Sequence, residues 1–204
     1  MKRLALATLV LLCSCGAPPR SDEALTAPLG APRAIALPAS AGAAHVEANW
    51  KERLAQPYVF LEPLGDYRRL GDAMRRLNAE SESVGIDVAG LPFALFFDDP
   101  GRVAADALRA RVCLPVAERP ARLGVLRFDT LPRAMVVYAR VPGAYPEAAR
   151  SYPALFSYLR ELGWSVGGPV REVYQASASA SELDLLASDA LVTEVQIPWT
   201  ARAE

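Results

Sequence analysis

Apolar residues recur at intervals of three and four positions in two stretches of the chain, the period of an amphipathic helix. The first stretch carries Tyr67, Leu70, Met74 and Leu77, and the second carries Ala148, Tyr152, Leu155, Leu159 and Leu162. Gly85 and Gly163 follow these stretches, and glycine accepts the left-handed conformation that ends many helices. Pro153 lies inside the second stretch and should start or kink that helix, because proline lacks an amide donor. The pattern therefore predicts two helices, each with one apolar face.

Other segments alternate in the manner of strands, whose successive side chains lie on opposite faces of a sheet. One face of the segment 170–174 should carry Val170, Glu172 and Tyr174. Near the C-terminus, one face should carry Thr193, Val195 and Ile197. Glu194 and Gln196 should then lie on the other face. If helices cover the more apolar face, the opposite face is mixed, which is typical of a small-molecule site and equally of a solvated surface.

The two halves of the chain repeat the same order of features. Three pairs of similar residues are 78 positions apart: Tyr67 and Tyr145, Gly90 and Gly168, and Phe96 and Tyr174. The segment 111–115 then aligns with 194–198, after a gain of five residues. Each half predicts a strand, a helix and two further strands, with a connector over 120–132. We expect an α+β domain of two similar halves over residues 49–199.

The first residues predict an exported lipoprotein. Two basic residues precede an apolar run over 4–12, which is too short to span a bilayer, since a spanning helix needs roughly 20 apolar residues. The run leads to Cys15, with the small Ser14 before it and Leu12 three places before it, and this arrangement resembles the bacterial lipobox. We expect residues 1–14 to be removed as a signal peptide and Cys15 to be lipidated. Cys13 is the rival acceptor, and an ordinary secretory signal is the alternative.

The segment that follows has no apolar periodicity. Residues 15–48 are rich in Ala and Pro, which predicts an extended, flexible tether that contains His45. Residues 200–204 should form a short tail. The chain should thus face the periplasm or the exterior from a lipid anchor, and Gly16 after the lipidated cysteine slightly favours the outer membrane.

Composition narrows the functions that the domain can have. The chain is 52% hydrophobic with a net charge of −1, which gives no support to nucleic-acid binding. Once Cys13 is removed and Cys15 is acylated, only Cys113 remains, which predicts no disulfide, no metal cluster and a small buried side chain. Because His45 lies outside the predicted domain, no histidine-dependent catalytic set can form there. We expect no metal and no cofactor.

The domain resembles the GyrI-like small-molecule-binding family, which also supplies the effector domains of AraC-type and MerR-type multidrug regulators. The matching segments are the turns at 96–100 and 143–145, the helix end at 159–163, and the strands at 171–174 and 197–198. The resemblance implies two βαββ repeats related by a pseudo-two-fold axis, with antiparallel sheets and a ligand cleft between them. It covers residues 49–199.

The resemblance also implies a ligand site. Glu172 would reach into the cleft, where aromatic rings and a poorly solvated carboxylate would attract a lipophilic cation. The ring residues carried over are Tyr174, Phe96, Tyr138 and Phe60. Ala94 stands 78 positions before Glu172, so that the cleft would be charged on one side only. A purely structural role remains open for each of these residues. The rings can be core residues, and Glu172 can form a surface ion pair with Arg171 or Arg111.

Three functions remain open at this point. The first is a non-catalytic lipoprotein that binds a hydrophobic small molecule, which can be cationic, with the membrane as its other partner and no nucleic acid. The second is a small-molecule hydrolase in which Glu172 activates water and Tyr174 or Tyr138 orients it. The third is a haem-binding protein, which the absence of a histidine from the domain disfavours. Trp164 and Trp199 are expected to be packing residues, and Glu194 to solvate a sheet edge.

Overall fold

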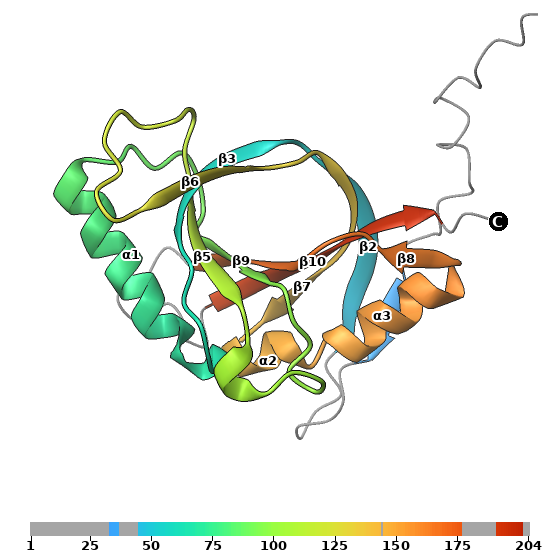
Figure 1. Ribbon diagram of the computed structural model, residues 1–204. Helices are drawn as coiled ribbons and strands as arrows, with labels where there is room; N and C mark the ends of the chain where they lie inside the picture. The colour runs from blue at the N-terminus through green and yellow to red at the C-terminus, as the bar shows by residue number, and fades with distance from the viewer. Residues whose placement is uncertain (1–32, 37–44, 144, 177–190, 202–204) are drawn as a thin grey trace, which may run out of the picture.

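The computed structural model of the protein describes residues 33–36, 45–143, 145–176 and 191–201. The predicted signal peptide and Cys15 lie outside these residues. The described part forms an α+β fold, as predicted, in which a curved antiparallel sheet carries its helices on one face (Figure 1). No helix in these ranges is both long and apolar enough to cross a membrane.

The sheet contains ten strands within the described residues. They are β1 (Arg33–Ala36), β2 (His45–Arg53), β3 (Gln56–Leu61), β4 (Phe93–Phe96), β5 (Ala110–Pro115), β6 (Arg127–Leu131), β7 (Ala134–Pro142), β8 (Trp164–Val166), β9 (Val170–Ala176) and β10 (Leu191–Ala201). Their order across the sheet is β1-β2-β7-β10-β9-β4-β5-β3-β6, and β8 pairs with β10. Each of these neighbours is antiparallel.

The sheet curls into a ring because two pairs of strands run almost directly into one another. Only Leu54 and Ala55 separate β2 from β3, and only Pro132 and Arg133 separate β6 from β7. Since β2 pairs with β7 and β3 pairs with β6, the two ends of the sheet approach each other at these bends. The ring is visible in Figure 1, with the helices outside it. The sheet therefore has a helix face, toward the helices, and an inner face, toward the middle of the ring.

The helices form where the apolar period predicted them. They are α1 (Leu70–Val84), preceded by a 3-10 turn at Tyr67–Arg69, and α2 (Tyr145–Ala149) and α3 (Tyr152–Glu161) in the second half. Gly85 and Gly163 follow the helices with φ of 72° at each, in the left-handed region. Pro153 lies in the first turn of α3. The second stripe is thus divided into two helices, because proline is accommodated at a helix start but not in its interior.

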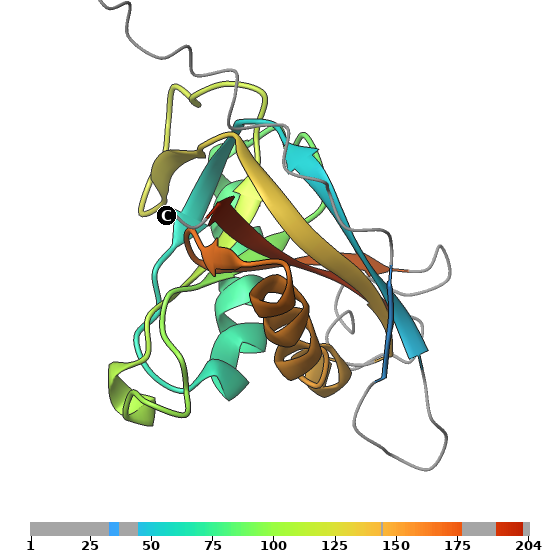
Figure 2. The same cartoon turned by 90° about the vertical axis from the view of Figure 1, so that its right-hand side faces the viewer.

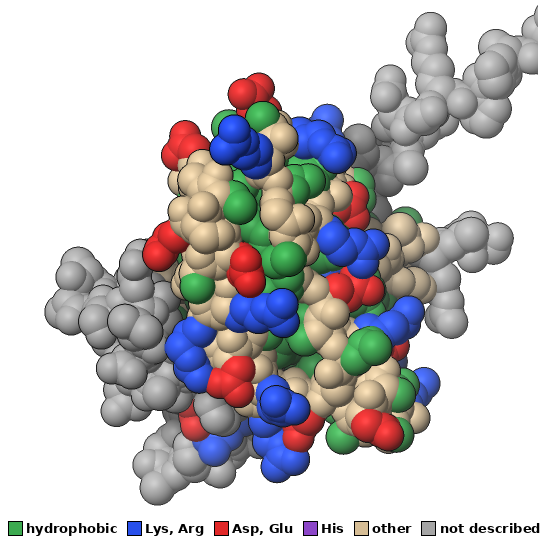
Figure 3. Space-filling view, turned by 60° about the vertical axis from the view of Figure 1, so that its left-hand side comes forward, with side chains coloured by type: hydrophobic (Ala, Val, Ile, Leu, Met, Phe, Trp, Pro, Cys, Tyr) green, Lys and Arg blue, Asp and Glu red, His purple; other side chains and the backbone are tan. Residues whose placement is uncertain are grey.

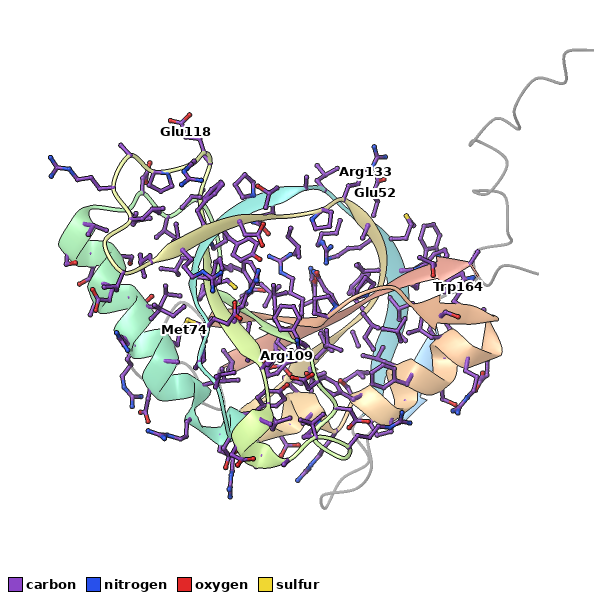
Figure 4. All side chains as sticks on the ribbon, viewed as in Figure 1. Glu52, Met74, Arg109, Glu118, Arg133 and Trp164 are labelled. Carbon is purple, nitrogen blue, oxygen red and sulfur yellow. The ribbon has the colours of Figure 1, made fainter. Side chains whose placement is uncertain are left out.

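The helices cover the helix face in two buried clusters. Leu70, Met74 and Leu77 of α1 pack on β3, β4 and β5, and Leu155 and Leu159 of α3 pack on β7 and β10. Figure 2 shows both helices on the same side of the strands, and Figure 4 shows Met74 directed from α1 toward the sheet. Burying a side chain such as Leu77 contributes roughly 1.5–3 kcal/mol. These clusters fix which face of each strand meets the helices.

A third cluster fills part of the ring on the inner face. It contains Tyr58, Phe60, Phe93, Leu95, Cys113 and Leu131. Cys113 is fully buried, which confirms the prediction of a small apolar side chain. Trp164 and Trp199 are packing residues as predicted, with stacked rings whose centroids are 3.7 Å apart. Both sides of the sheet are therefore packed with side chains.

The sheet begins earlier in the chain than expected. β1 and the first residues of β2 lie in the stretch that was predicted as a flexible tether, and Arg33–Ala36 pairs with His45–Ala48. The reason is the alternation that starts before Asn49: Val46 and Ala48 are buried, while Glu47 between them is exposed. The predicted connector over 120–132 likewise contains a strand, β6.

Candidate functional site

Glu172 lies in the middle of the sheet, on the helix face. It belongs to β9, and its Cα partners are Ala94 on β4 and Val195 on β10. Only 1% of its surface is exposed. The alternation predicted for 170–174 places Glu172 on the face that α1 and α3 cover. A carboxyl group thus lies at a position where most neighbours are apolar.

Two tyrosine hydroxyls satisfy the buried carboxyl group. The Oη of Tyr174, two residues further along the same face of β9, donates to Glu172 Oε2 at 2.9 Å. The Oη of Tyr152, the first residue of α3, donates to Glu172 Oε1. One donor therefore comes from the sheet itself and the other from the helix that covers it. Hydrogen bonds of this kind are required when a polar group is removed from water.

Burial dominates the electrostatics of this carboxyl group. Desolvation raises the pKa of Glu172 to about 7, against the two tyrosine hydrogen bonds, which favour the ionised form. No basic side chain within the described ranges forms an ion pair with Glu172. The alternative interpretation of Glu172 as one member of a surface ion pair with Arg171 or Arg111 therefore does not hold. Arg171 is the neighbour of Glu172 on β9, so its side chain lies on the other face of the sheet. Arg111 pairs with Glu62 and Asp129.

Phe96 lies on the same face as Glu172 and Tyr174, as the family resemblance implied. It belongs to the buried cluster under α1 that also contains Tyr174. Its ring meets that of Tyr67 edge-on, with centroids 4.9 Å apart. Ala94, between Phe96 and the start of β4, is fully buried beside Glu172. The helix face around the acid therefore combines aromatic rings with a small side chain.

Tyr138 and Phe60 do not join this group, which corrects the site expected from the sequence. Tyr138 is the Cα partner of Gln196, which puts it on the inner face, where the Lys51 Nζ lies 4.4 Å from the centre of its ring. Phe60 belongs to the cluster inside the ring. The physical reason is strand parity: neighbours on the helix face are Val59 and Ala139, one residue away in each case. A shift of one position moves a side chain through the sheet.

The sequence assigned no site role to Tyr152. It was placed in the apolar stripe of the second helix, where its ring does pack, but its hydroxyl reaches Glu172. Only its position beside Pro153 could have singled it out, because a tyrosine at a helix start can direct its polar end away from the helix body. Glu194 also differs from expectation: it lies on β10 within the sheet and pairs with Lys51 and Arg140 rather than solvating an edge.

Metal binding finds no support in the described part of the chain, where no cluster of three or more His, Cys, Asp or Glu side chains is suited to an ion. Surface charges are mixed in sign, as Figure 3 shows for one face. What remains is a buried acid, aromatic rings and hydroxyl donors between a sheet and its helices. A buried acid with a raised pKa beside aromatic rings is a common feature of functional sites.

The chain belongs to the GyrI-like family. Residues 49–199 match the family model described as "GyrI-like small molecule binding domain". A protein of Edwardsiella piscicida named DNA gyrase inhibitor is 34% identical over 134 residues, which are 62% of this chain and 85% of that protein. The family assignment made from the sequence is therefore confirmed.

Solved structures show the same fold at low sequence identity. The C-terminal domain of EcmrR superposes with a TM-score of 0.65 at 17% identity, covering 77% of this chain and 99% of that domain. In the EcmrR–DNA complex, the match spans 58% of the EcmrR chain. SAV2435, solved with bound tetraphenylphosphonium, superposes with a TM-score of 0.53 at 14% identity, covering 75% of this chain and 93% of SAV2435.

Proposed function

We propose that the protein is an exported, membrane-anchored lipoprotein whose GyrI-like domain binds a hydrophobic, cationic small molecule at Glu172. One observation carries the binding proposal: a glutamate with 1% exposure has two tyrosine hydroxyls but no basic partner in the described ranges. A buried carboxylate without a counter-ion is costly, and a bound cation would supply the missing charge. The anchor rests on the lipobox around Cys15.

The surroundings of Glu172 suit a lipophilic cation rather than a hydrated one. Aromatic faces attract cations, and Coulomb attraction is stronger where water is excluded. Tyr174 and Phe96 provide buried rings on the same face. A ligand of this class would gain both from apolar contact and from the charge of the acid. The tetraphenylphosphonium bound to SAV2435 is a molecule of this class and a natural probe.

Access to Glu172 requires a movement, because its side chain is covered. Tyr152, which donates to Glu172, stands at the start of α3, immediately after the residues that separate α3 from α2. A side chain at a helix start can swing away at less cost than one held in a helix interior, since the first turn lacks part of its hydrogen bonding. Displacement of Tyr152 is thus the movement that uncovers the acid.

The two-repeat organisation stays a prediction that the strand pairing supports. Ala94 and Glu172, 78 positions apart in the sequence, are Cα partners across β4 and β9. Two halves related by a two-fold axis between these strands would bring equivalent residues together in this way. The axis would pass beside a single acid, since alanine occupies the equivalent position.

Binding of tetraphenylphosphonium, measured by isothermal titration calorimetry, tests the proposal. The protein would be the full chain with Cys15→Ser, so that no lipid is attached. Glu172→Gln should weaken binding at least tenfold at pH 8, because it removes the charge and keeps the shape. The matched control is Glu118→Gln, which removes an exposed acid on a loop outside the ring (Figure 4).

Equal affinities of Glu172→Gln and the parent chain would overturn the cation site. Triphenylphosphine oxide, a neutral molecule of similar shape, separates charge from apolar contact: its affinity should not change in Glu172→Gln. If both probes lost affinity equally in Glu172→Gln, the variant would have disturbed the fold rather than the charge.

The anchor needs its own experiment. Cells expressing the full chain would be labelled with radioactive palmitate, which enters the acyl groups of bacterial lipoproteins. The parent chain and Cys13→Ser should be labelled and fractionate with membranes, whereas Cys15→Ser should carry no label. Label retained in Cys15→Ser would refute the proposed acceptor, and an unlabelled parent would refute the lipoprotein.

A small-molecule hydrolase is the second candidate function. The pKa of Glu172, raised to about 7, is suited to a general base near neutral pH, and Tyr174 and Tyr152 would orient it. The same variant distinguishes the two functions in a screen of electrophilic esters and epoxides. Loss of turnover in Glu172→Gln with retained binding favours the hydrolase, whereas lost cation affinity without any turnover by the parent favours the binding protein.

A further inference from the structure

Arg171, the residue before Glu172, lies on the inner face and is 5% exposed. Its Nη2 donates to Gln56 Oε1, and its Nη1 lies 3.4 Å from Gln196 Oε1. The guanidinium carbon lies 4.0 Å from the centre of the Phe93 ring. Its Nε has no hydrogen-bond partner among the described residues. The hydrogen-bond partners of Arg171 are therefore neutral, and the Glu194 carboxylate acts on it only as a nearby charge.

Arg53 is a second buried cation on the same face. It is 8% exposed, its Nη2 donates to Pro132 O at 2.9 Å, and its Nε also has no partner among the described residues. Burial, and after it the positive charge of Arg53, lowers the pKa of Arg171 to about 10. Both guanidinium groups nevertheless stay charged at neutral pH. Two like charges with little solvent around them are unfavourable unless an anion compensates them.

A cavity of about 260 Å³ lies beside Arg171 on the inner face. Its polar lining residues are Gln56, Arg140, Arg171, Gln175, Glu194 and Gln196. Guanidinium and amide groups thus border one space, where Arg140 Nε and Gln196 Nε2 already donate to Glu194, which leaves Arg171 as the cation without an ion pair among the described residues. This volume is below the range of roughly 300–1,000 Å³ typical of drug-sized ligands. The cavity is suited to a small molecule or to one end of a larger one.

Glu194 is the acid in this lining, and basic side chains already compensate it. Its Oε1 pairs with Lys51 Nζ, and its Oε2 accepts from Arg140 Nε at 3.0 Å. Gln196 Nε2 also donates to Glu194 at 2.6 Å. Glu194 therefore forms its ion pairs with Lys51 and Arg140. It acts on Arg171 only through space, where its charge raises the pKa of Arg171 by less than burial and Arg53 lower it. The cavity keeps a net positive character.

We propose that this inner cavity is a second ligand site, which binds the carboxylate or phosphate group of a small anionic molecule through Arg171. The planar guanidinium group is suited to two parallel hydrogen bonds with such an oxyanion. The positive charge of Arg53 adds to the attraction, and the side-chain oxygens of Gln56 and Gln196, which accept from Arg171, orient its guanidinium group. The site lies across the sheet from Glu172, so that it does not depend on cation binding there.

Thermal unfolding and calorimetry of the full chain with Cys15→Ser test this site with three probes at equal ionic strength: sodium benzoate, inorganic phosphate and sodium chloride. Benzoate or phosphate should raise the Tm above that in chloride, and the anion that does so identifies the class of ligand. Arg171→Lys keeps a cation but loses the fork, and should weaken the anion at least tenfold. The control is Arg133→Gln, since Arg133 is 68% exposed at the bend beside Glu52 (Figure 4).

Each outcome bears on the proposal. A specific effect of benzoate or phosphate that survives in Arg133→Gln and is lost in Arg171→Lys supports it. Equal effects of all three salts, or an effect that persists in Arg171→Lys, overturn it. Should Arg171→Lys fail to fold, Arg140→Gln serves as the second variant, because Arg140 lines the same cavity. Anion binding unchanged in Glu172→Gln would show that the two sites are separate.

Discussion

Glu172 and Arg171 are consecutive residues that face opposite sides of one sheet, and each is buried without an ion-pair partner among the described residues. Desolvation moves their pKa values in opposite directions, to about 7 for Glu172 and to about 10 for Arg171. At neutral pH the acid can therefore give up its charge by binding a proton, whereas the guanidinium group cannot give up its own. The charge of Glu172 on the helix face therefore changes with pH near neutrality, whereas the charge of Arg171 on the inner face does not.

The exposed charges of the domain behave differently from these two. Arg109 forms a pair with Asp98, and Arg68 forms one with Asp66 at the molecular surface. Both signs are interspersed in Figure 3. Surface pairs of this kind contribute little to stability, because water screens them. The exposed charges thus have partners, whereas Glu172 and Arg171 have no ion-pair partner among the described residues, and this contrast is the basis of the two proposed sites.

The largest expected effect comes from replacing the buried acid Glu172. The native state keeps the Glu172 proton to higher pH than the unfolded chain does, so stability from this group is complete below the unfolded pKa of about 4.5 and is lost as the pH rises through about 7. Glu172→Gln removes this loss. From pH 4 to pH 8, the unfolding free energy of the variant should gain about 3 kcal/mol relative to that of the parent.

Urea unfolding at several pH values measures this difference. Glu118→Gln, which changes an exposed acid, should follow the parent at every pH. A constant difference between Glu172→Gln and the parent from pH 4 to pH 8 would mean that Glu172 has an ordinary pKa in the native state. Glu172 would then not be an unusual charge, and the proposed difference between the helix face and the inner face would rest on Arg171 alone.

A somewhat smaller effect is expected on ligand affinity. Because a cation binds the ionised form of Glu172, binding should release a proton wherever the free acid is protonated. Tetraphenylphosphonium affinity should fall about 30-fold from pH 8.5 to pH 5.5, with the midpoint near the pKa of about 7. Calorimetry in buffers of different ionisation enthalpy reports the released proton directly. A flat affinity over this range would contradict the assignment, and anion binding on the inner face should show no such midpoint.

The smallest effect separates two tyrosines on opposite faces. Tyr152→Phe removes a donor to the ionised carboxylate, which should raise the pKa of Glu172 by about one unit. Because binding displaces Tyr152, the lost hydrogen bond destabilises only the free protein, and cation binding at pH 7 should become about twofold stronger. Tyr138→Phe is the matched change on the inner face and should leave the pH midpoint unchanged. The midpoint of tetraphenylphosphonium affinity reports both. A shift in Tyr138→Phe equal to that in Tyr152→Phe would show that the faces are not independent.

Much of the fold could be predicted from local pattern. The helix stripes, the glycines that end them and the restart at Pro153 were read from residue spacing, because a helix is a local structure whose period appears in the sequence. Strand parity similarly placed Glu172 with Tyr174. The ring could not be foreseen, because it depends on the near-continuity of β2 with β3 and of β6 with β7, which is a matter of long-range pairing.

The candidate site was predicted in part for the same reason. Phe96 and Tyr174 lie on the face of Glu172, whereas Tyr138 and Phe60 lie across the sheet from it. The repeat suggested that these rings were equivalent, but equivalence does not tell which face a strand residue occupies. Tyr152 was visible only as a member of an apolar stripe, and its contact with Glu172 joins residues 20 positions apart.

By itself the sequence determined the family, the α+β class, the two helices and the identity of one unusual acid, since each is carried by local spacing or by recognisable segments. The tertiary structure alone decided that this acid is buried without a cation, that Tyr152 covers it, and that Arg171 faces a separate cavity. The physical reason is that burial and charge compensation depend on which distant strands and helices surround a side chain, and hydrogen-bonded pairing across the sheet sets those neighbours.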